Sequence, residues 1–164
     1  MKEIHPSAVI HPTAIIYDNV TIEENVQIGP LCIIGAPAET KKKNTNAGVI
    51  IRSGTVLHGA VTVDSGAERK TVIWENCFLM KGTHIGHDAI IGSFVTISPG
   101  AKVGGYCEID PHCNIGMNAT IHQRLKVPGG CMIGMLTAVT KKTELKANGV
   151  YVGTPARWIR ENRK

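Results

Sequence analysis

The sequence predicts an all-β solenoid, and three observations carry this prediction. The first is an aliphatic residue at every sixth position through most of the chain, a fixed period that neither a helix nor a twisted sheet requires. The second is a small or branched residue two positions before each aliphatic one, where another inward side chain must fit beside a corner. The third is the aromatic content of 4%, which suits a narrow core of Ile, Val and Ala.

The hexads form three unbroken runs, and a flat side of six residues that ends in a corner explains each run. Three sides would make a coil of 18 residues, so the 21 hexads predict seven coils, stacked roughly 4.8 Å apart. Glycine often follows the aliphatic residue, as at Gly86 and Gly104, where we expect positive φ at a tight turn. The aliphatic positions are Ile4, Ile10, Ile16, Ile22, Ile28 and Ile34; Ile51, Leu57 and Val63; and Ile73, Leu79, Ile85, Ile91, Ile97, Val103, Ile109, Ile115, Ile121, Val127, Ile133 and Val139.

The repeat is interrupted twice, and both interruptions predict loops. Two successive aliphatic positions are 17 residues apart around an insertion near residues 36–48, and two others are ten apart around a smaller loop near residues 64–70. The first insertion has the composition of an exposed loop. We therefore expect a solenoid domain over residues 1–140 that carries both loops.

The C-terminal extension, residues 141–164, departs from the hexad pattern. Thr154 before Pro155 is typical of a helix start, with threonine as the N-cap and proline at the first helical position. We expect a short helix near residues 155–162 that caps the coil stack. Such a cap would also cover an exposed sheet edge.

Composition limits the function classes. The net charge of +5 comes from basic clusters that are either solvated or attract phosphate groups, but no aromatic platform accompanies them, which disfavours nucleic acid. No apolar run suggests a membrane span or a signal peptide, so we expect a cytoplasmic protein without membrane insertion. The five cysteines occupy the small inward slot, which predicts buried thiols rather than disulfides or zinc ligands: Cys32, Cys77, Cys107, Cys113 and Cys131.

One edge of the predicted solenoid collects unusual residues. If the hexads are grouped in threes from the first, both loops leave from the corner that follows the third side. In later coils the same corner carries the sequences Gly86-His87-Asp88, Gly104-Gly105-Tyr106 and His122-Gln123-Arg124. Loops on a rigid scaffold commonly carry function, so we expect the site here.

The segment from Leu79 to Asp88, with its His-x-x-His-Asp pattern, and the later His122-Gln123 pair resemble motifs of a known family. They are similar to the UDP-N-acetylglucosamine O-acyltransferases of lipid A synthesis, which are hexapeptide-repeat acyltransferases. The resemblance covers about Ile4 to Val139. It implies a left-handed parallel β-helix, a homotrimer, and an enzyme that acylates a sugar or nucleotide-sugar at a hydroxyl or amine.

The ending favours a different acyl donor. That family continues into a sizeable helical domain, whereas only about 25 residues follow Val139 here, and the segment Val152–Arg157 is similar to coenzyme-A-dependent sugar acetyltransferases. We therefore expect acetyl-CoA as co-substrate, with no permanently bound cofactor. A long-chain acyl carrier protein thioester is the alternative donor.

The resemblance assigns His87 as general base, a role that suits an imidazole near neutral pH. Asp88 would orient that ring, and Gly105, which lies 18 residues on at the same corner, would donate its N–H to the oxyanion. The expected acceptor contacts are His84, Asp64, Arg69 and His122. The expected donor contacts are Gly105, Tyr106, Gln123, Arg124 and Lys141.

Two other functions remain as alternatives. A γ-type carbonic anhydrase is also a trimeric left-handed β-helix, but it uses a pair of histidines five residues apart, and this sequence has no such pair, so no metal ligands are expected. A scaffold without catalysis is the second alternative, since fold does not imply function. Turnover of an acyl thioester would separate a scaffold from an enzyme.

Overall fold

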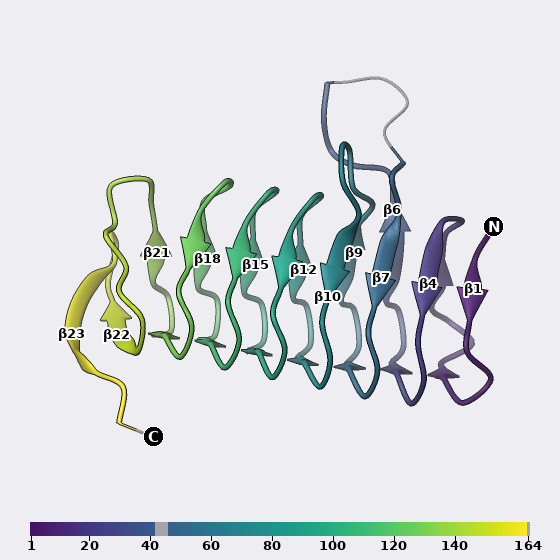
Figure 1. Ribbon diagram of the computed structural model, residues 1–164, viewed down its shortest axis with the longest axis horizontal. Helices are drawn as coiled ribbons and strands as arrows, with labels where there is room; N and C mark the ends of the chain where they lie inside the picture. The colour runs from purple at the N-terminus through teal and green to yellow at the C-terminus, as the bar shows by residue number, and fades with distance from the viewer. Residues whose placement is uncertain (42–45, 164) are drawn as a thin grey trace.

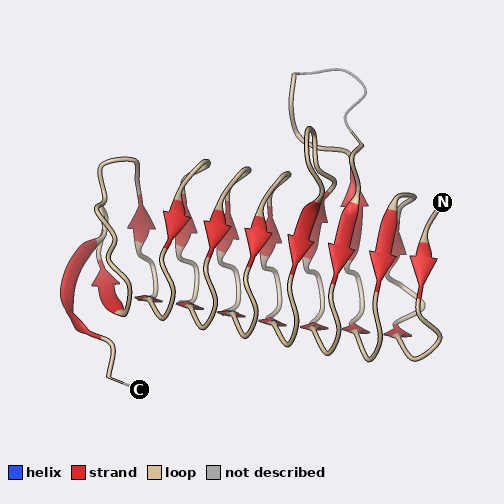
Figure 2. Cartoon of the chain, in the orientation of Figure 1, coloured by secondary structure: helices blue, strands red, loops and turns tan. Residues whose placement is uncertain are grey.

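The computed structural model describes residues 1–41 and 46–163, and these wind into a parallel β-helix with three sides (Figure 1). Each coil contributes one short strand to each of three sheets. The described residues contain strands and turns but no helix (Figure 2). The predicted all-β solenoid of about seven coils is confirmed.

The first sheet comprises β1 (Glu3–Ile4), β4 (Val20–Ile22), β7 (Val49–Ile51), β10 (Thr71–Ile73), β13 (Ile90–Ile91), β16 (Glu108–Ile109) and β19 (Lys126–Val127). The second comprises β2 (Val9–Ile10), β5 (Gln27–Ile28), β8 (Val56–Leu57), β11 (Phe78–Leu79), β14 (Thr96–Ile97), β17 (Asn114–Ile115), β20 (Met132–Ile133), β22 (Gly149–Val152) and β23 (Arg157–Glu161). The third comprises β3 (Ile15–Ile16), β6 (Ile33–Ala36), β9 (Thr62–Asp64), β12 (His84–Ile85), β15 (Lys102–Val103), β18 (Thr120–Ile121) and β21 (Ala138–Val139).

The register between coils is the one that the hexads predict. Ile73 pairs with Ile91, and Ile85 pairs with Val103, so aliphatic residues 18 apart lie one above another. From β4 onward these side chains are almost fully buried and form one continuous core along the axis. The five cysteines are free and buried in that core, as predicted.

The corners differ from expectation in one respect. Neither Gly86 nor Gly104 has positive φ; the left-handed residue lies two positions later, as at Asp88, with φ 60°. Glycine is needed at position 86 because a Cβ there would lie 2.7 Å from the backbone nitrogen of Gly105. The prediction of positive φ was wrong at these two glycines, where close approach of neighbouring coils sets the requirement, and right at Gly35, which also follows an aliphatic residue and has φ 84°.

The predicted C-terminal helix is also wrong. Arg157–Glu161 instead forms β23, which runs antiparallel to β22 and pairs with its outer edge. Pairing satisfies backbone groups that an uncovered strand would leave open, and Trp158 and Ile159 suit a strand. This tertiary contact outweighs the local helix-start signal at Thr154 and Pro155. The end of the stack is thus covered by a strand.

Both insertions project from the edge between the third and first sheets, beyond β6 and β9 (Figure 1). We call this edge, with its corners at 86–88, 104–106, 122–124 and 140–142, the loop edge. Gly48 and Gly66 join the two insertions through an antiparallel bridge. Residues 42–45 of the first insertion lie outside the described residues. No helix long and apolar enough to cross a membrane occurs in the described part of the chain.

Candidate active site

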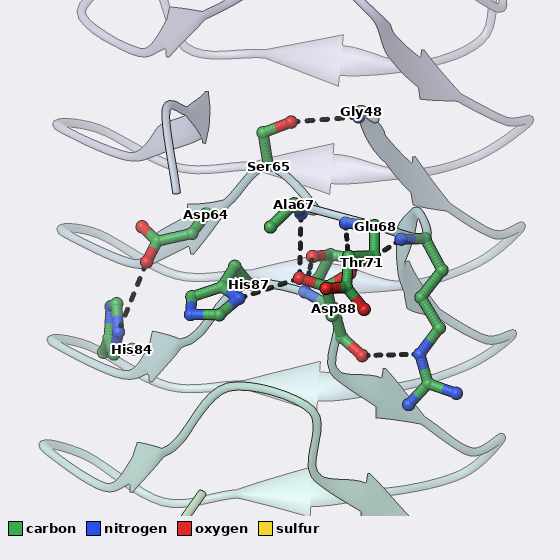
Figure 3. A network of polar contacts seen from close by, with 10 residues as sticks. Gly48, Asp64, Ser65, Ala67, Glu68, Thr71, His84, His87 and Asp88 are labelled. Carbon is green, nitrogen blue, oxygen red and sulfur yellow. Dashed lines mark hydrogen bonds and ion pairs between the residues drawn. The ribbon is translucent and has the colours of Figure 1, made fainter. Parts of the chain in front are cut away.

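His87 and Asp88 form a hydrogen-bonded pair at the loop edge (Figure 3). The ring Nδ1 lies 2.8 Å from Asp88 Oδ2. The Asp88 side chain is fully buried, whereas the His87 ring keeps 14% of its surface exposed. The left-handed backbone at Asp88 turns its side chain back toward the preceding residue, so two adjacent residues can point together.

The second loop surrounds the Asp88 carboxylate with main-chain donors. Its N–H groups at Ala67, Glu68 and Arg69 donate to the two carboxylate oxygens over 2.7–2.8 Å. Burial alone would raise the pKa of Asp88, but the three N–H groups and the His87 ring outweigh burial and hold the pKa below its usual range. Asp88 is therefore an anion near neutral pH.

The charge of Asp88 fixes the proton on the His87 ring. A carboxylate accepts hydrogen bonds and donates none, so Nδ1 of His87 must carry the hydrogen of this contact. The lone pair then lies on Nε2 at the other side of the ring. This tautomer leaves a proton acceptor facing away from Asp88.

Gly105 lies directly against that acceptor. A Cβ at position 105 would be 2.9 Å from Nε2 of His87, so only glycine leaves the space beside the ring open. The N–H of Gly105 donates to no residue that the structure describes, whereas its carbonyl accepts from Arg124. An acceptor atom bound there would be close to the ring.

Asp64 and His84 lie beside His87 on the outer face of the third sheet (Figure 3). His84 Nε2 is 3.8 Å from Asp64 Oδ2, and His84 Nδ1 is 2.8 Å from the Thr62 hydroxyl. Burial raises the pKa of Asp64 to about 6, with a further contribution from Glu39. Burial also lowers the pKa of His84. Burial thus shifts both groups toward their neutral forms, although Asp64, with a pKa of about 6, is still mostly ionised at pH 7.

Tyr106 and Arg124 extend the site along the loop edge. The Tyr106 ring meets the His87 ring edge-on, with centroids 5.1 Å apart, and the Arg124 guanidinium lies 3.9 Å from the Tyr106 centroid. Arg69 donates through Nε to the Asp88 carbonyl and forms an ion pair with Glu108. A groove lies beside these side chains, lined by Glu68, Arg69, Tyr106, Glu108, Arg124, Leu125 and Lys126.

Three predicted contacts lie farther from His87. His122 is exposed, and its Nδ1 contacts the carbonyl of Gln123. Gln123 and Lys141 are exposed in the same corner column as His87 and Gly105. Lys141 is three coils from His87, about 14 Å at the usual strand spacing. The structure thus groups His87, Asp88, Gly105, His84, Asp64, Arg69, Tyr106 and Arg124, and leaves these three along the edge.

Sequence reasoning missed the donors to Asp88, because main-chain N–H groups have no residue signature. It also missed Thr71, whose hydroxyl accepts the Asp88 N–H at 2.8 Å, and Ser65, which links the two insertions. A threonine two positions before Ile73 fits the small inward slot and gave no other signal. No three His, Cys, Asp or Glu side chains among the described residues are close enough to form a metal site.

The chain was compared with known families. Residues 2–40 and 70–105 match the family of bacterial transferase hexapeptides, with six repeats. The matched coils are similar to bacterial transferase hexapeptide repeats. The predicted resemblance is thereby confirmed, and with it the left-handed parallel β-helix of the hexapeptide-repeat acyltransferases.

Curated relatives of these hexapeptide repeats include two acyl-[acyl-carrier-protein]–UDP-N-acetylglucosamine O-acyltransferases. The protein from Helicobacter pylori is 31% identical over 119 residues, which cover 70% of this chain and 44% of the relative. The protein from Campylobacter concisus is 32% identical over 103 residues, which cover 61% and 39%. The chain thus spans less than half the length of these relatives.

Solved structures of similar fold agree. LpxA from Acinetobacter baumannii superposes with a TM-score of 0.74 at 25% identity, covering 97% of this chain and 74% of that one. LpxA from Bacteroides fragilis, a UDP-N-acetylglucosamine acyltransferase, has a TM-score of 0.78 at 25% identity, with the same coverage. Almost the whole chain therefore has a counterpart in these folds.

Proposed function

We propose that the chain is an acyltransferase that moves an acyl group from a thioester to a hydroxyl of a nucleotide-sugar. One observation carries the proposal: a buried Asp88 anion directs the free nitrogen of His87 toward the open space beside Gly105. The names of the relatives indicate the same reaction class.

In the proposed reaction, Nε2 of His87 takes the proton of the acceptor hydroxyl as its oxygen attacks the thioester carbonyl. Asp88 stabilises the imidazolium that forms, because its carboxylate is already held as an anion. The Gly105 N–H stabilises the oxyanion of the tetrahedral intermediate. Collapse of the intermediate breaks the carbon–sulfur bond, and His87 returns the proton to the leaving thiolate.

For the donor, we favour an acyl carrier protein thioester over acetyl-CoA. The expectation of acetyl-CoA rested on the C-terminal segment, whereas the relatives matched over the coils are named for acyl carrier protein and for UDP-N-acetylglucosamine. Their names support the alternative donor and a UDP-N-acetylglucosamine acceptor. The acceptor contacts at His84, Asp64, Arg69 and His122, and the donor contacts at Tyr106, Gln123, Arg124 and Lys141, are part of this proposal.

We also propose that the chain assembles as a homotrimer, as the resemblance implies, and that it acts in the cytoplasm, as its composition led us to expect. The outward side chains of Ile50, Val72 and Ile90 are only partly buried and lie on neighbouring strands of the first sheet, with Trp74 close by. An apolar strip of this kind suits a contact between subunits. Light scattering on the purified chain should give three times the monomer mass; a monomer at micromolar concentration would contradict assembly.

The donor is tested with matched thioesters. Purified chain and UDP-N-acetylglucosamine are incubated with acyl carrier protein thioesters of several chain lengths, or with acetyl-CoA, and thiol release and product mass are measured. Faster turnover with the carrier protein thioesters is expected. Faster turnover with acetyl-CoA would restore the original expectation, and no turnover with any donor would contradict the proposed function.

A further inference from the structure

The buried Asp88 anion depends on a support that lies outside the reacting groups. Its carboxylate receives three successive loop N–H groups, so the position of the second loop decides where the carboxylate lies. That loop is a surface insertion in a repeat that does not otherwise need it. Something must therefore fix the loop against the coil (Figure 3).

Thr71 holds one end of this arrangement. It is fully buried where the second loop enters β10, and its hydroxyl accepts the N–H of Asp88 at 2.8 Å. Asp88 is the left-handed residue of its corner, so this bond joins the end of the loop to the residue whose backbone turn directs the carboxylate.

Ser65 holds the other end. It is fully buried, donates its hydroxyl hydrogen to Asn46 Oδ1 at 2.7 Å, and accepts the Gly48 N–H at 2.9 Å. The main chain adds bonds from Gly66 N–H to the Gly48 carbonyl and from Thr71 N–H to the same oxygen. The end of the first insertion thereby fixes the start of the second loop.

We infer that Thr71 and Ser65 are positioning residues, which act on His87 through the loop and Asp88. The two insertions act together. The first fixes the position of the second, and the second holds the Asp88 carboxylate that orients the His87 ring. Neither hydroxyl touches the space beside Gly105. The role in catalysis rests on the proposed function, whereas the effect on the imidazole does not.

The repeat supplies a matched control for Thr71. Thr55 is also a fully buried threonine in the slot two before the aliphatic residue. Its hydroxyl accepts the Cys77 N–H at 3.1 Å, in the corner between the first and second sheets. The Thr55 hydroxyl also donates to the Trp74 carbonyl at 2.9 Å, so Thr55→Val removes the same kind of bond and one more, away from the loop edge.

The first measurement needs no substrate. In protein labelled with 15N-histidine, the Nδ1–H of His87 should give a proton signal slowed in exchange by its bond to Asp88, assigned by its loss in His87→Ala. We expect Thr71→Val to broaden or remove this signal. Thr71→Ser, which keeps the hydroxyl, should restore it, and Thr55→Val should leave it unchanged.

The second measurement is turnover. Thr71→Val should lower kcat by roughly 10- to 100-fold with a smaller change in KM, because misplacement of a catalytic group by about 1 Å has effects of this size. Ser65→Ala should lower kcat less, and it replaces Thr71→Val in both measurements if that variant does not fold.

An unchanged imidazole signal in Thr71→Val, or an equal loss in Thr55→Val, would overturn the inference. So would a failure of Thr71→Ser to restore the signal. Absence of turnover in the unmodified chain would contradict the proposed function instead, and the imidazole signal would still decide the positioning role.

Discussion

Asp64 and Asp88 lie on neighbouring coils of the loop edge and are both largely withdrawn from water, yet their pKa values shift in opposite directions. Burial raises the pKa of Asp64 to about 6, and its closest ionisable contact, His84, is 3.8 Å away. Asp88 is more deeply buried, but three N–H groups and the His87 ring hold its pKa low. The number of hydrogen-bond donors, and not the depth of burial, decides in which direction the pKa of each carboxyl shifts.

The largest effect is expected at His87, whose ring Asp88 orients. His87→Ala should lower kcat by about 10²–10⁴-fold while the coil core stays folded, because general-base catalysis contributes about that much. Rates with a carrier protein thioester measure it, and circular dichroism checks the fold. His11→Ala, at an exposed corner of the first coil, is the control and should keep its rate. An unchanged rate in His87→Ala would remove it as the base.

The next effect tests the anion itself. Asp88→Asn should lower kcat by at least about 10²-fold and the free energy of unfolding by about 2–4 kcal/mol. Each carboxylate oxygen accepts a loop N–H, so either orientation of the amide sets its NH₂ group against a donor. Urea denaturation and initial rates measure the two losses. A variant as stable as the unmodified chain would show that the loop donors contribute little.

The stability contribution of Asp88 also has a pH dependence. Because its pKa is lowered in the folded state, the contribution is present above the unfolded pKa of about 3.9 and is lost as the pH falls through the lower folded value. The difference in unfolding free energy between the unmodified chain and Asp88→Asn should therefore be constant near neutral pH and shrink in acid. A difference that grows in acid would contradict the low pKa.

Gly105 tests the space on the other side of His87. Gly105→Ala would place a Cβ 2.9 Å from Nε2 and 3.1 Å from the main-chain carbonyl oxygen of His87, so we expect kcat/KM to fall by roughly 10- to 100-fold with a smaller loss of stability, since the ring can move more easily than the main chain. Gly129→Ala is the matched control, because Gly129 holds the same second position of a corner between the first and second sheets. Equal losses in both variants would indicate a requirement of the corner and not of the site.

The smallest effect is expected for Asp64, the carboxyl whose pKa is raised. Because the folded pKa of Asp64 is raised, its charged form disfavours folding, and this cost appears as the pH rises from about 4 through about 6. Asp64→Asn should therefore raise the free energy of unfolding by about 1–2 kcal/mol at pH 8 and leave it unchanged near pH 4. Urea denaturation at both values measures this. A loss of stability at pH 8 would contradict the raised pKa.

Sequence reasoning reached the fold because the period of six is set by side-chain packing, which each hexad repeats. It failed where main-chain contacts between distant segments decide. Pairing with β22 turned the expected helix into β23, and the approach of neighbouring coils, not positive φ, explains Gly86. In both cases the structure depends on a contact with a distant segment, which a local sequence pattern does not identify.

For the site, the spacing of 18 residues predicted that His87 and Gly105 lie at one corner and that both loops lie at the same edge. The spacing could not show that Asp88 would be turned toward His87, since adjacent residues on a strand usually point apart. That turn depends on a left-handed φ at Asp88 and on donors from the second loop. Arg69 was expected to contact the acceptor. In the structure its Nε donates a hydrogen bond to the Asp88 carbonyl.

The left-handed third corner position has a consequence for engineering the chain. Asparagine and glycine adopt this backbone readily, and Asn76 and Gly54 occupy it at two corners. Leu31 and Leu136 occupy it with mostly exposed side chains, so they carry the conformational cost without the benefit of burial. Replacing them with asparagine offers a route to a more heat-resistant chain that leaves the loop edge untouched.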